Sequence, residues 1–215
     1  LYQVGQLHLY RKTFDVLGTD PYPIPSVPAR QAARYTVLSR ESVLGSRPIW
    51  IVPQSMNWAS YRTTEEEKKL CRPPTLGELR SMSWQCITEG ATGLIYYSWF
   101  DLRKFPDSFP QEWANNKQVA AEIKQWVPVL LSIERVPRLK TKSQDWLHWT
   151  TRQVGDETYL FVVNDEGQEH EASFELPAAA KEVLLDGQEK PITPEGTTLP
   201  VRLGAFELKV YKIRL

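Results

Sequence analysis

The chain has 215 residues, and its 26 lysines and arginines are balanced by 26 aspartates and glutamates, so its formal net charge is zero. This balance argues against a nucleic-acid-binding protein, which needs an excess of basic residues to neutralise phosphates. A composition of 41% hydrophobic and 24% charged residues is typical of a water-soluble globular protein, and no apolar run approaches the ~20 residues of a membrane span.

Apolar strand patterns alternate with helical patterns in the first part of the chain. The patterns predict strands at residues 14–20, 48–53 and 93–100, and helices at 29–44, 75–89 and 110–128. Thr75 and Glu78 fit a capping box at the start of the second helix, and the IWIV run is typical of a strand buried on both faces. The charged run 65–69 predicts a solvated loop. Strands and helices in alternation predict three neighbouring β/α units with a parallel sheet.

The period of the pattern changes to two beyond about residue 135. Turn signals such as Gly155-Asp156 separate six predicted short strands, at 146–154, 158–164, 169–176, 182–185, 198–203 and 206–213. Short strands at this spacing predict a small antiparallel β-sandwich. The expected fold is therefore α/β plus all-β, with domains at residues 1–135 and 136–215.

Polar and aromatic side chains follow each of the three strands predicted in the first domain. Ligands of parallel β/α sheets bind at the carboxyl ends of the strands, so these side chains are expected to share one site. Indole faces pack on sugar rings, while carboxylates and amides bind hydroxyl groups, and together they predict a carbohydrate site. The predicted substrate-binding residues are Tyr22, Gln54, Asn57, Trp58 and Trp99, and the candidate carboxylates are Asp20 and Asp101. Trp84 and Trp126 lie in helical patterns and are predicted core residues.

The segments GTDPYPIP, IWIVPQSMNW and PTLGELRSMSWQCITEGATGLIYYSWFD resemble the last three β/α units of TIM-barrel glycoside hydrolases, which often carry a β-sandwich domain. The resemblance covers about residues 14–135 and implies strands six to eight of the barrel. Three units cannot close a barrel. We therefore expect a fragment of a longer protein that begins before Leu1, or alternatively a partner chain that supplies the missing strands.

The resemblance also identifies where catalytic carboxyl groups are expected. Glycoside hydrolysis needs two of them, and many retaining enzymes of this class place the nucleophilic glutamate after strand seven. The matching position is Gln54, an amide that cannot act as nucleophile or base, and the strand that normally precedes the acid is not in this chain. Asp20 and Asp101 remain as catalytic candidates, with Tyr22 tuning Asp20 and Trp99 forming the floor of the cleft. The alternatives are that Asp20 binds a hydroxyl group or caps the turn before Pro21, and that Asp101 caps a helix or turn.

Three functions follow from these observations. The first is a carbohydrate-active protein, the C-terminal portion of a glycoside hydrolase; the second is a carbohydrate-binding protein without catalysis; the third is an assembly subunit whose open barrel edge binds another chain. An oligosaccharide or glycoside is the expected partner, and no cofactor, metal, nucleic acid or membrane is expected. Cys71 and Cys86 show no metal-ligand spacing, and the sequence leaves both their redox state and the compartment open.

Overall fold

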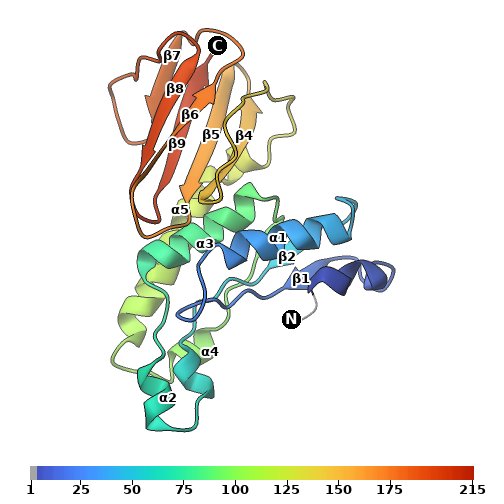
Figure 1. The fold of residues 1–215 in the computed structure, drawn as a ribbon, viewed down its shortest axis with the longest axis vertical. Coiled ribbons are helices and arrows are strands. Elements are labelled where there is room, and N and C mark those ends of the chain that lie inside the picture. Colours follow the sequence, from blue (N-terminus) through green and yellow to red (C-terminus); the bar gives the residue numbers. More distant parts are fainter. Residues whose placement is uncertain (1–3) are drawn as a thin grey trace. The chain divides into compact units, whose positions relative to one another are not determined.

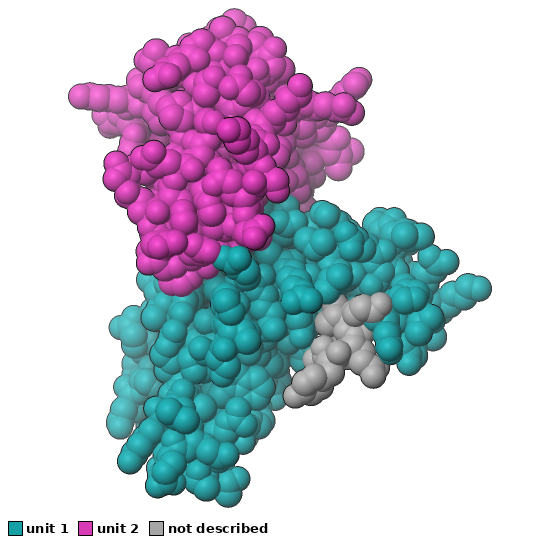
Figure 2. Space-filling view, in the orientation of Figure 1, with its two compact units in different colours: residues 1–120 teal, residues 121–215 magenta. Residues whose placement is uncertain are grey.

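The computed structural model describes residues 4–215 and divides them into two units, residues up to 120 and residues 121–215 (Figures 1 and 2). The division falls inside helix α5, earlier than the expected boundary after residue 135. The expectation that the natural protein begins before Leu1 concerns a part of the protein outside the described residues.

Unit 1 contains a parallel sheet of three strands in the order β1-β2-β3. Its strands are β1 (Leu17–Thr19), β2 (Ile49–Ile51) and β3 (Gly93–Leu94). Its helices are η1 (Val4–Tyr10), α1 (Gln31–Ser42), η2 (Trp58–Tyr61), α2 (Glu65–Lys69), α3 (Leu76–Thr88), α4 (Trp99–Leu102) and the first half of α5 (Phe109–Leu130). The parallel pairing of three consecutive strands confirms the topology predicted from the alternating pattern.

Helix α1 packs against one side of this sheet, and α3 packs beside α1 (Figure 1). Ile49 and Ile51 are buried on that side, and the amide of Gln85 accepts a hydrogen bond from Ala33 N at 3.2 Å, which joins the two helices. Trp84 is fully buried in α3, as predicted.

The opposite face of the sheet is open. Trp50 lies on it with 44% of its surface exposed, so the prediction that β2 is buried on both faces was wrong. The indole lies across β3, where a Cβ added to Gly93 would meet Trp50 Cδ1 at 2.7 Å. Glycine at position 93 therefore makes room for the tryptophan on the open face.

Three local predictions need correction or refinement. Strand β3 is shorter than the predicted 93–100, because residues 99–102 form the short helix α4. The run 65–69 is a helix rather than a loop, since Thr64 and Glu67 form a capping box. Helix α5 continues past Pro128 to Leu130.

Unit 2 contains two antiparallel sheets, one of order β4-β5-β9-β7 and one pairing β6 with β8. The strands are β4 (Leu147–Val154), β5 (Glu157–Asn164), β6 (His170–Glu175), β7 (Glu182–Leu185), β8 (Thr198–Leu203) and β9 (Leu208–Arg214). All six predicted strands are present, and the Gly155-Asp156 hairpin is confirmed by the pairing of Val154 with Glu157.

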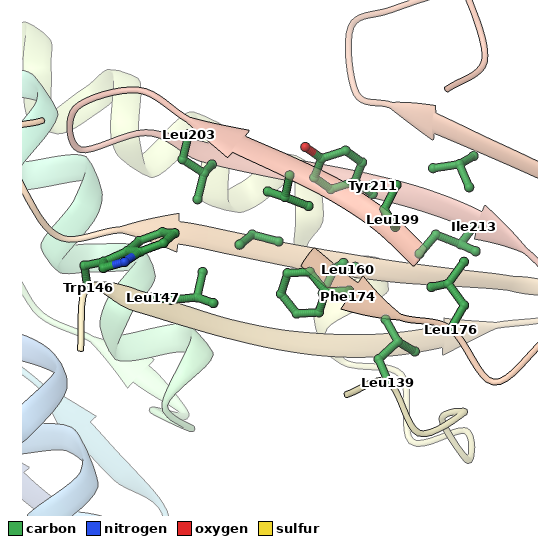
Figure 3. Close-up of a cluster of buried hydrophobic side chains, with 13 residues drawn as sticks. Leu139, Trp146, Leu147, Leu160, Phe174, Leu176, Leu199, Leu203, Tyr211 and Ile213 are labelled. Carbon is green, nitrogen blue, oxygen red and sulfur yellow. The ribbon is translucent and has the colours of Figure 1, made fainter. Parts of the chain in front are cut away.

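Both antiparallel sheets contribute to one hydrophobic core (Figure 3). Phe174 and Leu199 of the two-stranded sheet lie in the same buried cluster as Leu160 and Ile213 of the four-stranded sheet, and all four are fully buried. Alternate residues of β8 are buried, as expected for a strand with one face on a core.

Candidate functional site

Aromatic side chains gather where the three parallel strands of unit 1 end. The rings of Tyr22 and Tyr97 are stacked with centroids 5.6 Å apart, and Trp58 packs edge-on against Tyr22 at 6.2 Å and against Tyr61 at 6.0 Å. We call these four residues the aromatic cluster. Because Tyr22 follows β1, Trp58 and Tyr61 follow β2 and Tyr97 follows β3, the parallel order of the strands brings them together.

The edge of the aromatic cluster is polar and partly exposed. The hydroxyls of Tyr61 and Tyr97 lie 2.9 Å apart, and these two residues are 47% and 40% exposed. Trp58 Nε1 donates to Tyr22 O at 3.1 Å, which fixes the indole. Exposed, fixed aromatic rings with hydroxyl groups at their edge match the amphipathic surface of a sugar.

Asp101 lies beside the aromatic cluster and is almost fully buried, with 1% exposure. Its carboxylate accepts hydrogen bonds from Ser98 Oγ at 2.6 Å, Tyr61 Oη at 2.8 Å and Lys104 Nζ at 2.6 Å. Burial alone would raise the pKa of Asp101, but these three donors outweigh it and lower the pKa. Asp101 is therefore ionised near neutral pH, and its carboxylate accepts the hydrogen bond that holds Tyr61 in place.

Asp20 is half-buried at the end of β1, and no hydrogen bond or ion pair of its side chain is found in the described part of the chain. It lies close enough to Tyr22 to affect its ionisation. Burial raises the pKa of Tyr22 well above its usual range, and the charges of Asp20 and Asp101 add to the shift. The structure thus brings both candidate carboxylates near one phenol.

Gln54 is fully buried after β2 and forms a parallel β-bridge with Tyr97. Its side chain accepts from Ile24 N at 2.8 Å and donates to Ile24 O at 2.8 Å and Met56 O at 3.0 Å. The side-chain amide of Gln54 therefore hydrogen-bonds only to main-chain groups, and through Ile24 it positions the turn after β1.

Two other predicted site residues have local partners. Asn57 Oδ1 accepts from Ala59 N at 2.9 Å and caps η2. Trp99 is half-exposed in α4, where Arg103 lies 4.7 Å from its ring centroid and Phe109 packs edge-on at 6.5 Å. No ring contact joins Trp99 to the aromatic cluster in the described residues.

Sequence reasoning missed Tyr61, Tyr97, Ser98 and Lys104. Tyr97 was inside a predicted strand and inside a segment that carries the family resemblance, but it was not assigned to the site; Tyr61 was inside a predicted loop without a motif. One signal for Tyr97 was its position two residues before Trp99 in the predicted strand 93–100, because side chains two apart in a strand share a face.

Residues 4–215 contain neither a cluster of metal ligands nor a helix suited to span a membrane. No group of three or more histidine, cysteine, aspartate or glutamate side chains is arranged there to hold a metal ion. None of the helices in that range combines the length and apolarity of a membrane span. Cys71 and Cys86 are both free thiols, and burial raises the pKa of Cys86 to about 12.

No protein-family model and no curated protein matches the sequence. Solved structures similar to the chain include the α-amylase of Geobacillus thermoleovorans in complex with acarbose (11% identity, TM-score 0.45, 100% of this chain and 63% of that one). An Anoxybacillus α-amylase is similar at 10% identity and a TM-score of 0.44, over 99% of this chain and 62% of that one. A GH30 endoxylanase from Clostridium papyrosolvens is similar at 11% identity and a TM-score of 0.45, over 95% of this chain and 50% of that one.

The chain thus spans less than two thirds of the length of these glycoside hydrolases.

Proposed function

We propose that this chain is a carbohydrate-active protein whose aromatic cluster binds an oligosaccharide. The observation that carries the proposal is the position of four aromatic side chains and an ionised carboxylate at the carboxyl ends of three adjacent parallel strands. Sugars offer apolar ring faces for stacking and hydroxyls for hydrogen bonds, and the exposed rings and hydroxyls of Tyr61 and Tyr97 provide both.

The proposal includes the architecture around the cluster. We propose that the parallel sheet is the strand six to eight segment of a (β/α) barrel, and that the two antiparallel sheets form a β-sandwich accessory domain. The open face at Trp50 and the edge strands β1 and β3 support the first part, because barrel strands have their inner face and edges covered by neighbours. We propose that further β/α units of the same polypeptide cover this face and these edges.

Replacing Tyr97 tests the sugar site. We expect Tyr97→Ala to weaken binding of the best oligosaccharide in a panel by about tenfold, or ~1.4 kcal/mol, because the stacked ring and its hydroxyl are both lost. Isothermal titration of the 215-residue chain measures the change. Tyr10→Ala is the matched control, since Tyr10 is an exposed tyrosine of η1. Equal affinities of the two variants would contradict the proposal.

We further propose that the protein hydrolyses glycosidic bonds, with Asp20 and Asp101 as the catalytic carboxyl groups. Asp20 is the better proton-transfer candidate, because three donors already hold the Asp101 carboxylate. We expect Asp20→Asn to abolish turnover of any aryl glycoside that the protein cleaves, while oligosaccharide binding persists. Unchanged turnover would remove Asp20 from the site.

Sugar binding without catalysis is the second candidate function. It is favoured by Gln54, an amide hydrogen-bonded to the main chain at the position where the resemblance implies a nucleophilic glutamate. It is also favoured by Asp101, whose carboxylate already accepts hydrogen bonds from three side chains. A protein that binds oligosaccharides through Tyr97 yet cleaves no glycoside would establish this function instead.

A further inference from the structure

Unit 2 has a pocket of about 180 Å³ that is remote in sequence from the site of unit 1. Residues from α5, β5, β7 and β9 line it together with the turn after β7. They are Trp126, Tyr159, Leu184, Leu185, Asp186, Gly187, Gln188, Val210 and Lys212. This volume is below the ~300–1,000 Å³ of sites for drug-sized ligands, so the pocket fits one ring rather than an extended molecule.

One wall of the pocket is an aromatic side chain held in a fixed orientation. The indole of Trp126 packs edge-on against Tyr159 at 5.9 Å and against Phe161 at 5.4 Å, with interplanar angles of 65° and 88°. Trp126 was predicted to be a core residue, but it is only partly buried, in contrast to Trp84. A rigid, partly exposed indole is a surface on which the apolar face of a sugar ring packs without ordering a flexible side chain.

The rim of the pocket offers unused hydrogen-bonding groups. Asp186 and Gln188 flank Gly187, whose φ of +78° permits the turn, and Asp186 N donates to Val210 O at 2.9 Å. Their side chains make no hydrogen bond or ion pair within residues 4–215, although the turn itself is fixed. A carboxylate and an amide on a fixed turn provide acceptors and a donor for vicinal hydroxyls.

The cationic side of the pocket is already neutralised. Lys212 Nζ pairs with Glu157 Oε1 at 2.6 Å, and Tyr159 Oη donates to Glu157 Oε2 at 2.7 Å. Hydrogen bonds from Lys212 and Tyr159 lower the pKa of Glu157 to about 2, so the pair stays ionised near neutral pH. Because Lys212 is paired with Glu157, the charge of Asp186 makes the pocket lining negative, and this disfavours an anionic ligand.

We propose that this pocket binds a single neutral pyranose ring, stacked on Trp126 and held by Asp186 and Gln188, as a second sugar site of the protein. The site uses none of the residues of the aromatic cluster, so it stands whether or not that cluster binds sugar.

Paired variants of the full chain test the second site. The probes are the methyl pyranosides of glucose, galactose, mannose and xylose, measured by isothermal titration and saturation-transfer NMR. We expect Asp186→Ala to weaken binding of the best probe at least tenfold and Trp126→Phe at least threefold. Asp156→Ala is the matched control, because Asp156 is also an exposed acid on a hairpin turn and lies outside the pocket lining.

Three outcomes separate this site from the aromatic cluster. Binding that is lost in Asp186→Ala and retained in Tyr97→Ala supports the second site. Binding that is lost only in Tyr97→Ala overturns it and leaves the proposed function standing. The absence of binding by all four probes also overturns it. Trp126→Phe keeps an apolar ring at position 126, and circular dichroism verifies that each variant is folded.

Discussion

Glu112 shows what a single buried side chain contributes to this protein. It lies in the first turn of α5 with 6% exposure, and neither carboxylate oxygen has a hydrogen-bond partner among the described residues. Burial raises the pKa of Glu112, and the nearby Ser108 hydroxyl opposes the shift only in part. A carboxyl group in such surroundings is stabilised in its neutral form.

This shift predicts a pH dependence of stability. The folded pKa lies above the unfolded value of ~4.3, so the folded state is favoured below pH ~4.3 and loses stability as pH rises through the folded pKa. We expect Glu112→Gln, which is neutral at every pH, to raise the free energy of unfolding at pH 7 and to flatten its decline between pH 4 and 7. Urea denaturation across that range measures both effects.

Glu66→Gln is the control for this prediction, because Glu66 is an exposed glutamate of the short helix α2. If both variants show the same pH profile as the parent chain, Glu112 ionises in the folded protein as it does in water.

At the scale of the element, helix α3 owes its start to two side chains that bond each other's main chain. Thr75 Oγ1 accepts from Glu78 N at 3.2 Å, and Glu78 accepts from Thr75 N at 2.8 Å. Arg72 holds the same carboxylate through two hydrogen bonds of 2.6 and 2.7 Å. Burial would raise the pKa of Glu78, but these donors lower it overall, so the cap is ionised near neutral pH. Capping therefore accounts for Glu78 without a catalytic role.

Removing the cap tests its contribution. We expect Thr75→Ala to lower the free energy of unfolding by about 1 kcal/mol, since an N-terminal N–H group of α3 loses its acceptor. Thr64→Ala removes the equivalent capping box of α2, a helix without buried residues, and should cost clearly less. The urea midpoints of the two variants measure these losses of stability. Equal losses would show that the packing of α3 does not amplify the effect of its cap.

At the scale of the whole molecule, the open face of the parallel sheet determines how the chain behaves by itself. Trp50 and Ile95 are 44% and 48% exposed, and β1 and β3 are the edges of the sheet. Exposed apolar groups beside sheet edges promote association with other chains. The proposed further barrel units would cover both.

We therefore expect the isolated chain to self-associate, and Trp50→Lys to weaken this association by roughly tenfold, or ~1.4 kcal/mol. Sedimentation velocity over a concentration series measures the monomer fraction. Leu70→Lys removes an apolar residue outside the sheet that is even more exposed, at 79%, and should leave association unchanged. A monomeric parent chain at high concentration would show that this face needs no cover.

The sequence by itself determined the features whose causes lie within a few residues. The capping box at Thr75, the Gly155-Asp156 hairpin and the six strands of unit 2 are set by local hydrogen bonds and by side-chain period. The three parallel strands followed from the same period together with the handedness of β/α connections.

Only the tertiary structure decided which side chains meet. Tyr61 and Tyr97 are 36 residues apart, and their hydroxyls touch because the strands before them are neighbours in register. The hydrogen bonds of the Gln54 amide to the main chain and the exposure of Trp50 likewise depend on which elements pack on each side of the sheet. A period of two shows that a strand has two faces, but which of them is covered is settled by packing between distant segments.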